Sequence, residues 1–453
     1  MSASNPQPTT NHVAVLAFPF GSHAGPLLTL VRKLSDAAPH LRFSFLSTAK
    51  SNDSVFSSIG VDRVKRFDVG DGLPEGYVYG QGKQLKVMEL FLEGAEERFK
   101  KGMETAASEM GEEIGCLISD AFYWFVGEMA EEMKVGWVAL WTSGPRPLLV
   151  HLCMDLIRKH IDINSCESRE KPLEFLPGFS SIQGADLPEE ILSPNLDSPF
   201  TNLLNKMSHH LPKATSVLIN SFEQIDSQIH DQLNSSLQNY LNIGPLTVLS
   251  PSPPPSDDHN CLLWLDNQPP NSVVYISFGG FLSLPPHELT ALADALQESQ
   301  IPFLWSFRGN PEEELPKRLL ESGKGKIVPW APQGQILMHS SVGAFMTHGG
   351  WNSVLESIVG GVPMIGRPFL GDQRLNLKTV ENVWGIGVGL EGGFVTKSGV
   401  LKALGLVLDS EKGKLTREKV EILRGLAHKA AESTTGSSSR NFIRLLEIVT
   451  RSI

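Results

Sequence analysis

The chain has 453 residues, of which 41% are hydrophobic and 20% are charged, a composition typical of a soluble globular protein and unlike disordered, collagen-like or coiled-coil chains. At roughly 150 residues per domain, this length predicts two large domains rather than one small binding module. The 39 basic and 50 acidic side chains leave a net charge of -11, which disfavours a nucleic-acid or anionic-membrane partner, so any phosphate must be bound locally.

The four cysteines, Cys116, Cys153, Cys166 and Cys261, form no C-x-x-C pair and have no histidine cluster nearby in the sequence, so neither a disulfide framework nor a zinc site is predicted. Residues 1–12 lack a basic segment followed by an apolar run, and no stretch approaches about 18 consecutive apolar residues. These features predict a cytoplasmic protein with no transmembrane helix and no bound metal.

Short apolar runs alternate with helical patterns along the first half of the chain. The run HVAVLAF at 12–18 is followed by Pro19 and Gly21 and then by the pattern AGPLLTLVRKLSDA, which predicts a buried strand, a tight turn and a helix. Further strands are predicted at LRFSFLST (41–48), CLISD (116–120), VALW (138–141) and SVLINS (216–221), and a further helix at AFYWFVGEMAEEM (121–133). Repeated strand and helix units indicate a parallel, doubly wound sheet.

A proline-rich segment at 244–258, GPLTVLSPSPPPSDD, separates this half from the next. Because prolines lack a backbone donor, we expect the segment to be extended and solvated, with a linker at 249–259 between domains at 1–248 and 260–435. The alternation of strand and helix patterns then resumes. Strands are expected at SVVYISFGG, PFLWSFR, KIVPW, GAFMTHGG and VPMIGRPF, and helices from about Pro286 and from Trp351 or Asn352.

The last segment, 436–453, has the pattern of an amphipathic helix, which we expect to pack back on the first domain. Together these elements predict an α/β fold of two Rossmann-like, doubly wound parallel-sheet domains that face each other across a cleft.

The second half contains a candidate phosphate site. The strand GAFMT ends at His348, and Gly349 and Gly350 would let a ligand approach bare backbone before the next helix begins. Unpaired N–H groups at a helix start attract phosphate, so a diphosphate can be held here without a metal ion, with Ser353 and His348 as additional donors. Glu356 lies one turn further on, where its carboxylate could accept hydrogen bonds from two vicinal ribose hydroxyls.

Trp330, at the end of KIVPW, could stack on a flat base. Taken singly, these residues have ordinary structural explanations, with Trp330 in a core, His348 in a turn and Glu356 on a solvated helix face. Their occurrence together between Trp330 and Gln373 favours a nucleotide site.

A second constellation lies in the first half. His23 follows the first strand at the start of a helix, where the helix dipole disfavours the imidazolium form and keeps the ring neutral. Asp120 ends the strand CLISD, so both side chains emerge at carboxyl ends of neighbouring strands, where open α/β sheets bind ligands. A capping histidine and a strand-end aspartate are each common, but beside a nucleotide site they predict a His–Asp dyad.

The window from Trp330 to Gln373, with its opening WAPQ, its central HGGWNS and its closing Asp372-Gln373, resembles the signature box of plant UDP-sugar glycosyltransferases, a family with the two-domain GT-B fold. The resemblance implies that Trp330 stacks on uracil and that Glu356 binds the ribose. The implied donor-binding residues are Ser22, Ser277, Trp330, Ala331, Gln333, His348, Trp351, Asn352, Ser353, Glu356, Asp372 and Gln373. Within this set, the resemblance assigns the nucleoside to Gln333, the diphosphate to His348, Asn352 and Ser353, and the sugar hydroxyls to Asp372 and Gln373, and Gln373 favours glucose.

The resemblance extends over nearly the whole chain and is closest to flavonoid 3-O-glucosyltransferases, through stretches such as VLAFPFGSHAGPLL, SFLSTAKSN, LPKATSVLINSFE and GGFVTKSG. It implies that His23 deprotonates the acceptor hydroxyl while Asp120 fixes the histidine tautomer. The implied acceptor-binding residues are Phe20, Gln84, Phe122, His151 and Leu370.

We therefore expect inverting, metal-independent transfer of glucose from UDP-glucose to a phenolic hydroxyl, most simply the 3-hydroxyl of a flavonol or anthocyanidin, by a monomer that needs no cofactor. The alternatives are a transferase that uses UDP-galactose or another sugar, and a catalytically silent protein that binds a flavonoid or a nucleotide sugar. A dehydrogenase is disfavoured, because GVGLEG at 387–392 matches G-x-G-x-x-G but opens no helix.

Three positions depart from the family pattern: Gly280 replaces a threonine or serine near the phosphates, Arg146 replaces an asparagine, and Leu370 replaces an aromatic residue. These changes predict altered donor affinity and acceptor choice. The neighbouring His209 and His210 lack the spacing of a metal site and are interpreted as surface residues.

Overall fold

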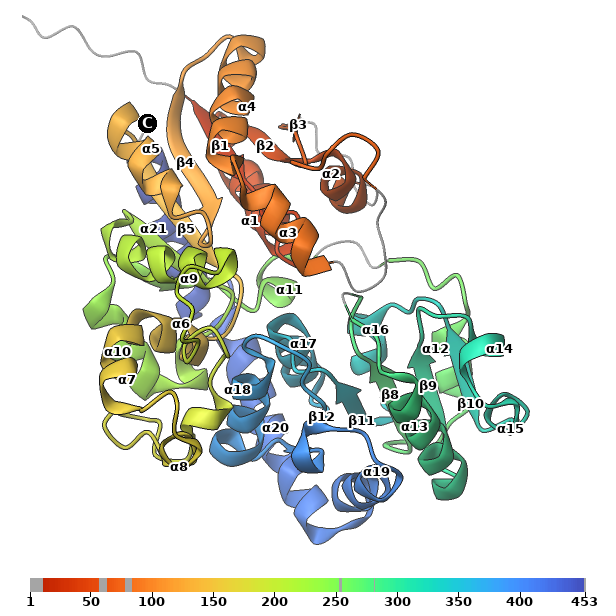
Figure 1. Cartoon of the computed structure of the whole chain (residues 1–453). Coiled ribbons are helices and arrows are strands. Elements are labelled where there is room, and N and C mark those ends of the chain that lie inside the picture. Colours follow the sequence, from red (N-terminus) through yellow and green to blue (C-terminus); the bar gives the residue numbers. More distant parts are fainter. Residues whose placement is uncertain (1–10, 57–62, 78–83, 252–254, 281, 452–453) are drawn as a thin grey trace, which may run out of the picture.

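Two parallel β-sheets, each covered by helices on both faces, form the two lobes of the protein (Figure 1). The structure is a computed structural model that describes residues 11–56, 63–77, 84–251, 255–280 and 282–451. Residues 1–10, which bear on the predicted absence of a targeting segment, lie outside the described residues. So do residues 252–254 of the predicted linker. The predicted class, two Rossmann-like parallel-sheet domains, is confirmed.

The N-terminal lobe contains a seven-stranded sheet in the order β3-β2-β1-β4-β5-β6-β7, with every neighbouring pair parallel. Its strands are β1 (His12–Leu16), β2 (Arg42–Thr48), β3 (Val64–Val69), β4 (Ile114–Asp120), β5 (Gly136–Trp141), β6 (Ser216–Ile219) and β7 (Tyr240–Asn242). The helices of this lobe are α1 (Ala24–Ala37), α2 (Ala49–Phe56), α3 (Gln84–Leu92), α4 (Ala95–Met110), α5 (Phe125–Met133), α6 (Pro145–Leu152), α7 (Met154–His160), α8 (Cys166–Arg169), α9 (Pro199–His210), α10 (Ser227–Ser236) and α11 (Leu246–Leu249). The strand order reverses between β1 and β4, which places a ligand-binding edge at their carboxyl ends.

The C-terminal lobe repeats this plan with a six-stranded parallel sheet in the order β10-β9-β8-β11-β12-β13. Its strands are β8 (Val273–Ser277), β9 (Phe303–Ser306), β10 (Gly325–Val328), β11 (Val342–Thr347), β12 (Met364–Gly366) and β13 (Gly387–Gly389). Its helices are α12 (Cys261–Asp266), α13 (Pro286–Ser299), α14 (Pro311–Glu314), α15 (Lys317–Leu320), α16 (Gln333–Leu337), α17 (Trp351–Gly360), α18 (Gln373–Lys378), α19 (Lys397–Leu404) and α20 (Glu411–Ala430). Here the order reverses between β8 and β11, so the corresponding edge lies where those two strands end.

The last helix, α21 (Ser437–Arg451), lies against the N-terminal lobe (Figure 1). Its apolar side chains Phe442, Leu445 and Val449 belong to the same buried cluster as Val13 and Leu30. The chain thus crosses between the lobes twice, which ties them together.

Two expectations about local structure are wrong. The proline-rich segment does not begin as extended chain, because Pro245 precedes the helix α11, whose Leu246 and Leu249 are buried in the core of the N-terminal lobe. A proline fits before the first helical turn, where no donor is needed. The helix expected from position 121 starts only at Phe125, because the Asp120 carboxylate accepts a hydrogen bond from the backbone N–H of Phe122 and holds a turn there.

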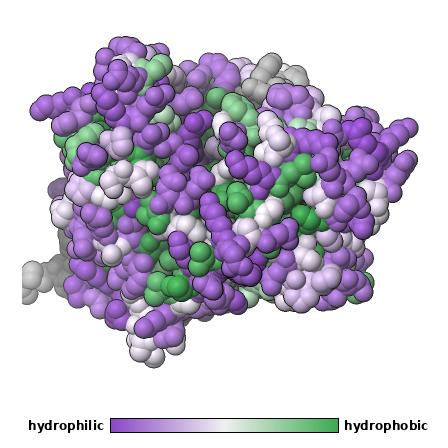
Figure 2. All heavy atoms as spheres, turned by 90° about the horizontal axis from the view of Figure 1, so that it is seen from below, coloured by the Kyte–Doolittle hydropathy of each residue, from purple (hydrophilic) through white to green (hydrophobic). Residues whose placement is uncertain are grey.

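Hydrophilic side chains predominate on the face of the molecule that Figure 2 shows, and apolar side chains form smaller groups among them. Among the helices in the described part of the chain, none is both long and apolar enough to cross a bilayer.

Candidate active site

The carboxyl edge of the N-terminal sheet brings together His23, Asp120 and Thr142. Nδ1 of His23 lies 2.7 Å from Oδ2 of Asp120 and 2.9 Å from the hydroxyl oxygen of Thr142. The residues come from three neighbouring strands, since His23 follows β1, Asp120 ends β4 and Thr142 follows β5. Because a carboxylate only accepts hydrogen bonds, this geometry places the proton of neutral His23 on Nδ1. Nε2, which keeps a free lone pair, is then the basic atom.

The dyad is anchored on one side and accessible on the other. The Asp120 side chain is 1% exposed, whereas that of His23 is 21% exposed. Phe18 and Phe122 hold the imidazole in place, with ring centroids 5.0 and 4.9 Å from that of His23. His23 also occupies the position before the first turn of α1, and its side chain makes no capping hydrogen bond there.

In the C-terminal lobe, β11 ends at Thr347 and α17 begins at Trp351, with His348, Gly349 and Gly350 between them. Gly349 has a φ of 82°, a left-handed conformation that favours glycine. Burial lowers the pKa of His348 to about 4, so this ring is neutral at physiological pH. Its Nδ1 is buried and has no hydrogen-bond partner in the described part of the chain, so one hydrogen-bonding position of this ring is unused. Together with the N–H groups at the start of α17, this turn is a candidate anion site.

Behind the start of α17, three polar side chains form a connected group. The amide nitrogen of Gln333 donates to Oγ of Ser353 at 3.0 Å and to Oε2 of Glu356 at 2.6 Å. Burial raises the pKa of Glu356, and the hydrogen bond from Gln333 opposes that increase. Trp330 follows β10 after Pro329 and is 40% exposed, so part of its indole is free to stack on a planar group.

Direct contacts join the two candidate sites. The side-chain amide of Asn352, in the first turn of α17, donates to the hydroxyl of Ser22 at 3.1 Å, and Ser22 directly precedes His23. The indole of Trp351 is buried and donates to the backbone oxygen of Asn220 at 2.8 Å. The start of α17, which belongs to the candidate anion site, therefore contacts the loop that carries His23.

Asp372 makes a further bridge between the lobes. Its Oδ2 accepts hydrogen bonds from the Ser143 hydroxyl of the N-terminal lobe and, at 2.8 Å, from Asn376. Burial raises the pKa of Asp372, these two hydrogen bonds lower it, and a protonated His23 lowers it further, which places this carboxyl within electrostatic reach of the dyad. The neighbouring Gln373 accepts hydrogen bonds from the backbone N–H groups of its own loop.

The other predicted donor residues have simpler positions: Ser277 is the last residue of β8, and Ala331 is buried beside Trp330. The structure thus gathers the predicted donor residues at the carboxyl edge of the C-terminal sheet and at its contact with the other lobe.

Aromatic side chains surround the dyad on the N-terminal side. Phe122 contacts Trp141 and Phe200 with centroid distances of 6.0 Å each, and Phe20 lies 5.3 Å from Phe18.

Among the remaining acceptor candidates, His151 is buried 5.6 Å from the Trp141 ring, and burial lowers its pKa to about 4. Leu370 is exposed on the opposite lobe. Gln84 begins α3, and the position of its side chain lies outside the described residues.

A cavity of about 630 Å³ lies elsewhere between the lobes. It is lined by Gln183 and Asp186 of the N-terminal lobe and by Pro368 and Arg374 of the C-terminal lobe. Neither His23 nor Asp120 lines it, so it is separate from the candidate catalytic groups.

Two remaining sequence features have structural explanations. Arg146 is a buried residue whose Nε lies 2.7 Å from the Asp226 carboxylate, so this departure from the family pattern joins α6 to α10 instead of facing a ligand. The interpretation of His209 and His210 as plain surface residues is incomplete, because they lie 3.3 and 3.4 Å from two different carboxylates and the second ring packs on Trp124.

The segment GVGLEG forms β13 and a turn. Among the described residues, no three histidine, cysteine or acidic side chains gather closely enough to hold a metal ion.

Sequence reasoning missed Thr142 and Ser143, which contact His23 and Asp372. A signal was present, because both follow β5, the neighbour of β4, and polar residues after adjacent parallel strands meet at one edge.

Comparison with known proteins places this geometry in context. A family model described as UDP-glucoronosyl and UDP-glucosyl transferase matches residues 235–428. A flavonoid 3-O-glucosyltransferase of Medicago truncatula is 49% identical over 443 residues, which is 97% of each chain. An anthocyanidin 3-O-galactosyltransferase of Actinidia chinensis var. chinensis is 50% identical, again over 97% of each chain. A crystal structure of a UDP-glucose:anthocyanidin 3-O-glucosyltransferase in complex with UDP superposes with a TM-score of 0.93 at 36% identity, covering 98% of this chain and 99% of that one.

Proposed function

Because the chain belongs to the family of UDP-glucuronosyl and UDP-glucosyl transferases, we propose that it transfers glucose from UDP-glucose to the 3-hydroxyl of a flavonol or anthocyanidin. The observation that carries this proposal is the hydrogen bond between Ser22 and Asn352, because it sets the loop of His23 against the first turn of α17. A base from one lobe and an anion site from the other therefore serve one reaction. The names of the relatives, which include flavonoid, flavonol and anthocyanidin 3-O-glucosyltransferases, support the choice of acceptor.

In the proposed reaction, Nε2 of His23 takes the proton of the acceptor hydroxyl as its oxygen attacks the anomeric carbon. Asp120 accepts the hydrogen bond from Nδ1–H of His23 and stabilises the imidazolium that forms, as the aspartate of a catalytic triad does. The bond from the anomeric carbon to the diphosphate breaks, and the N–H groups of α17 with His348 stabilise the departing charge. One displacement from the opposite side inverts the anomeric centre. A phenolic acceptor suits a single histidine, because a phenol ionises near pH 10.

The donor site takes the nucleotide in the same proposal. Trp330 stacks on uracil, Gln333 contacts the nucleoside and Glu356 accepts from the ribose hydroxyls. Asp372 and Gln373 contact the sugar. Aromatic rings around His23, with few polar groups among them, match a flat polyphenol.

The assay that tests the proposal combines purified protein with UDP-glucose and a flavonol, and locates the attached sugar by NMR. The matched control is the flavone that lacks only the 3-hydroxyl. We expect a β-linked 3-O-glucoside from the flavonol and no product from the flavone. Equal glucosylation of both acceptors would contradict the assigned regiochemistry, and no turnover of any flavonol or anthocyanidin would leave the silent binding protein as the better explanation.

A second donor deserves the same assay, because a relative with 50% identity is a galactosyltransferase. Side-by-side initial rates with UDP-glucose and UDP-galactose decide between the two sugars. We expect a higher kcat/KM with UDP-glucose, and a preference for UDP-galactose would correct the donor.

We further propose that the reaction needs no metal ion and that the protein acts as a cytosolic monomer. Helix N–H groups and side-chain donors supply the contacts to the diphosphate, and the four cysteines are all unpaired, as thiols are in a reducing compartment. Full activity after exhaustive treatment with EDTA, a monomeric mass by light scattering and a cytosolic signal from a fluorescent fusion are the expected results. Loss of activity that only a divalent ion restores would contradict the proposal that the reaction needs no metal ion.

A further inference from the structure

The turn that follows β8 carries two consecutive glycines, and a different side chain lies against each. A Cβ on Gly279 would lie 3.1 Å from Cε1 of His348, and a Cβ on Gly280 would lie 2.8 Å from Cζ of Arg308. The bare backbone of this turn therefore makes room for an imidazole beside one residue and a guanidinium beside the next. His348 belongs to the candidate anion site, so Arg308 borders the same region.

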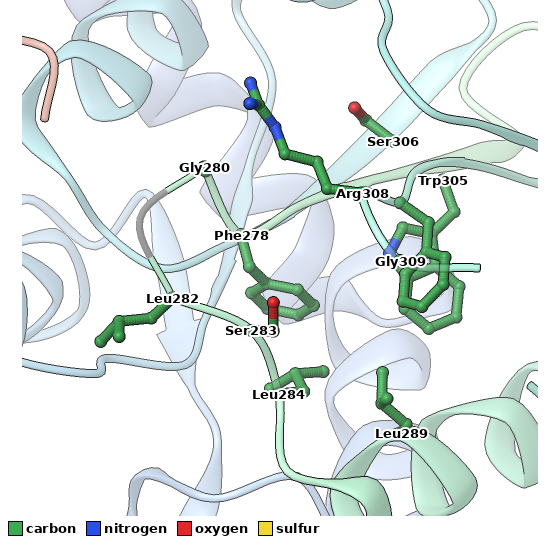
Figure 3. Close-up of a pocket in the computed structure, with 12 residues that line it drawn as sticks. Phe278, Gly280, Leu282, Ser283, Leu284, Leu289, Trp305, Ser306, Arg308 and Gly309 are labelled. Atoms are coloured by element: carbon green, nitrogen blue, oxygen red, sulfur yellow. The ribbon is translucent and has the colours of Figure 1, made fainter. Parts of the chain in front are cut away.

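Arg308 follows β9, which pairs in parallel with β8. Figure 3 shows its side chain extending alongside the turn at Gly280 and away from the apolar side chains of Phe278 and Leu289 that line the adjacent cavity. Arg308 is exposed and makes no hydrogen bond or ion pair within the described ranges of the chain. Its guanidinium is therefore free to bind a ligand.

The charge of Arg308 also acts on the nucleotide side of the lobe. Burial raises the pKa of the Tyr275 phenol, Glu356 adds to this increase and Arg308 opposes it. Tyr275 in turn donates to Gln333 at 3.3 Å. Arg308 and the proposed ribose-binding Glu356 are thus within electrostatic reach of one phenol.

The proposed donor site needs a positive charge. Its other side chains are neutral or acidic, since Glu356 and Asp372 carry carboxyl groups and the pKa of His348 is lowered to about 4. A nucleoside diphosphate brings at least two negative charges, and arginine binds such groups through paired, charge-assisted hydrogen bonds. We propose that Arg308 is a donor-binding residue whose guanidinium contacts the diphosphate of the UDP-sugar, in the space that the missing side chain of Gly280 leaves open. This inference rests on the donor site proposed above.

The test compares the binding of UDP and of uridine, which lacks the diphosphate, by calorimetry. We expect Arg308→Ala to weaken UDP binding by roughly tenfold to a hundredfold, the range for a lost charge-assisted contact, and to leave uridine binding unchanged. Arg308→Lys should keep part of the affinity as a point charge. The matched control is Lys324→Ala, which removes an exposed cation that precedes β10. Lys324 therefore lies at the amino-terminal end of the strands, whereas Arg308 follows the carboxyl end of β9. Thermal unfolding checks that each variant is folded.

A second variant tests the space beside the turn. Gly280→Ala adds only a Cβ, without a hydroxyl, and should weaken UDP binding several-fold by displacing the guanidinium. The same change in the Arg308→Ala background should have no further effect, because its target is gone. Additive losses in the double variant would contradict the claim about Gly280.

The outcomes separate this inference from the proposal beneath it. If the wild-type protein binds UDP no more tightly than uridine, the anion site itself is wrong. If the wild type favours UDP and Arg308→Ala binds it equally well, or loses UDP and uridine equally, the anion site stands and the role of Arg308 is refuted.

Discussion

The substitution Asp120→Asn tests the dyad most sharply because it changes one atom. The Asp120 carboxylate accepts two hydrogen bonds, one at Oδ2 from Nδ1 of His23 at 2.7 Å and one at Oδ1 from the N–H of Phe122 at 3.0 Å. An asparagine has a single oxygen, and we expect the backbone N–H to retain it. The amide NH₂ then faces Nδ1, which must accept, so the proton moves to Nε2 and the base is lost.

The expected loss in kcat is roughly 10³-fold to 10⁴-fold, as for a triad aspartate, or about 4 to 5.5 kcal/mol of transition-state stabilisation. The affinity for UDP, measured by calorimetry, should stay within about twofold, because the nucleotide contacts come from the other lobe. Asp231→Asn, on the exposed face of α10, is the matched control and should be fully active. A kcat within tenfold of the wild type in folded Asp120→Asn protein would refute the reasoning.

Three further predictions concern the anion site and stability. Gly350→Ala would place a Cβ 2.5 Å from Nε2 of His348, so UDP affinity should fall by at least about tenfold, whereas Gly334→Ala, with open space around it, should bind normally in the same calorimetric assay. The pKa values of His348 and His151 are lowered to about 4 in the folded protein, whereas histidines in the unfolded chain are protonated below about pH 6.5. The free energy of unfolding should therefore be undiminished above about pH 7 and fall by about 3 kcal/mol per histidine between pH 6.5 and 4. A melting temperature independent of pH over this range would contradict this prediction. Arg146→Ala leaves a buried carboxylate without its partner and should cost about 3 to 5 kcal/mol of stability in thermal unfolding while UDP affinity is kept, and an unchanged melting temperature would show that the ion pair is dispensable.

Most of the strands that sequence reasoning recognised are buried on both faces. β1, β4 and β8 are continuous apolar runs, and each was predicted to within a few residues. β3 mixes buried positions with exposed charged residues, and β7 has only three residues, so neither has a signal of its own. Their strand form depends on the neighbouring strand with which each pairs, which local sequence cannot show.

The candidate site was predictable where residues end strands, and less so where they act across the lobes. His23 and Asp120 could be paired in advance because β1 and β4 are adjacent and parallel. The bonds from Ser22 to Asn352 and from Ser143 to Asp372 join residues more than 200 positions apart, and nothing in either local sequence specifies them. The position of Arg308 against Gly280 is likewise set by the pairing of β8 with β9. The only related signal in the sequence was that Gly280 lacks the hydroxyl group found at this position in the family.

A crystal structure with UDP and a flavonol bound together would test most directly whether one lobe supplies the base and the other the diphosphate site. We predict phosphate oxygens at the start of α17 beside His348, and the flavonol 3-hydroxyl within about 3.2 Å of Nε2 of His23. A flavonol whose 3-hydroxyl faces away from His23, or a diphosphate bound elsewhere than at this helix start, would contradict it.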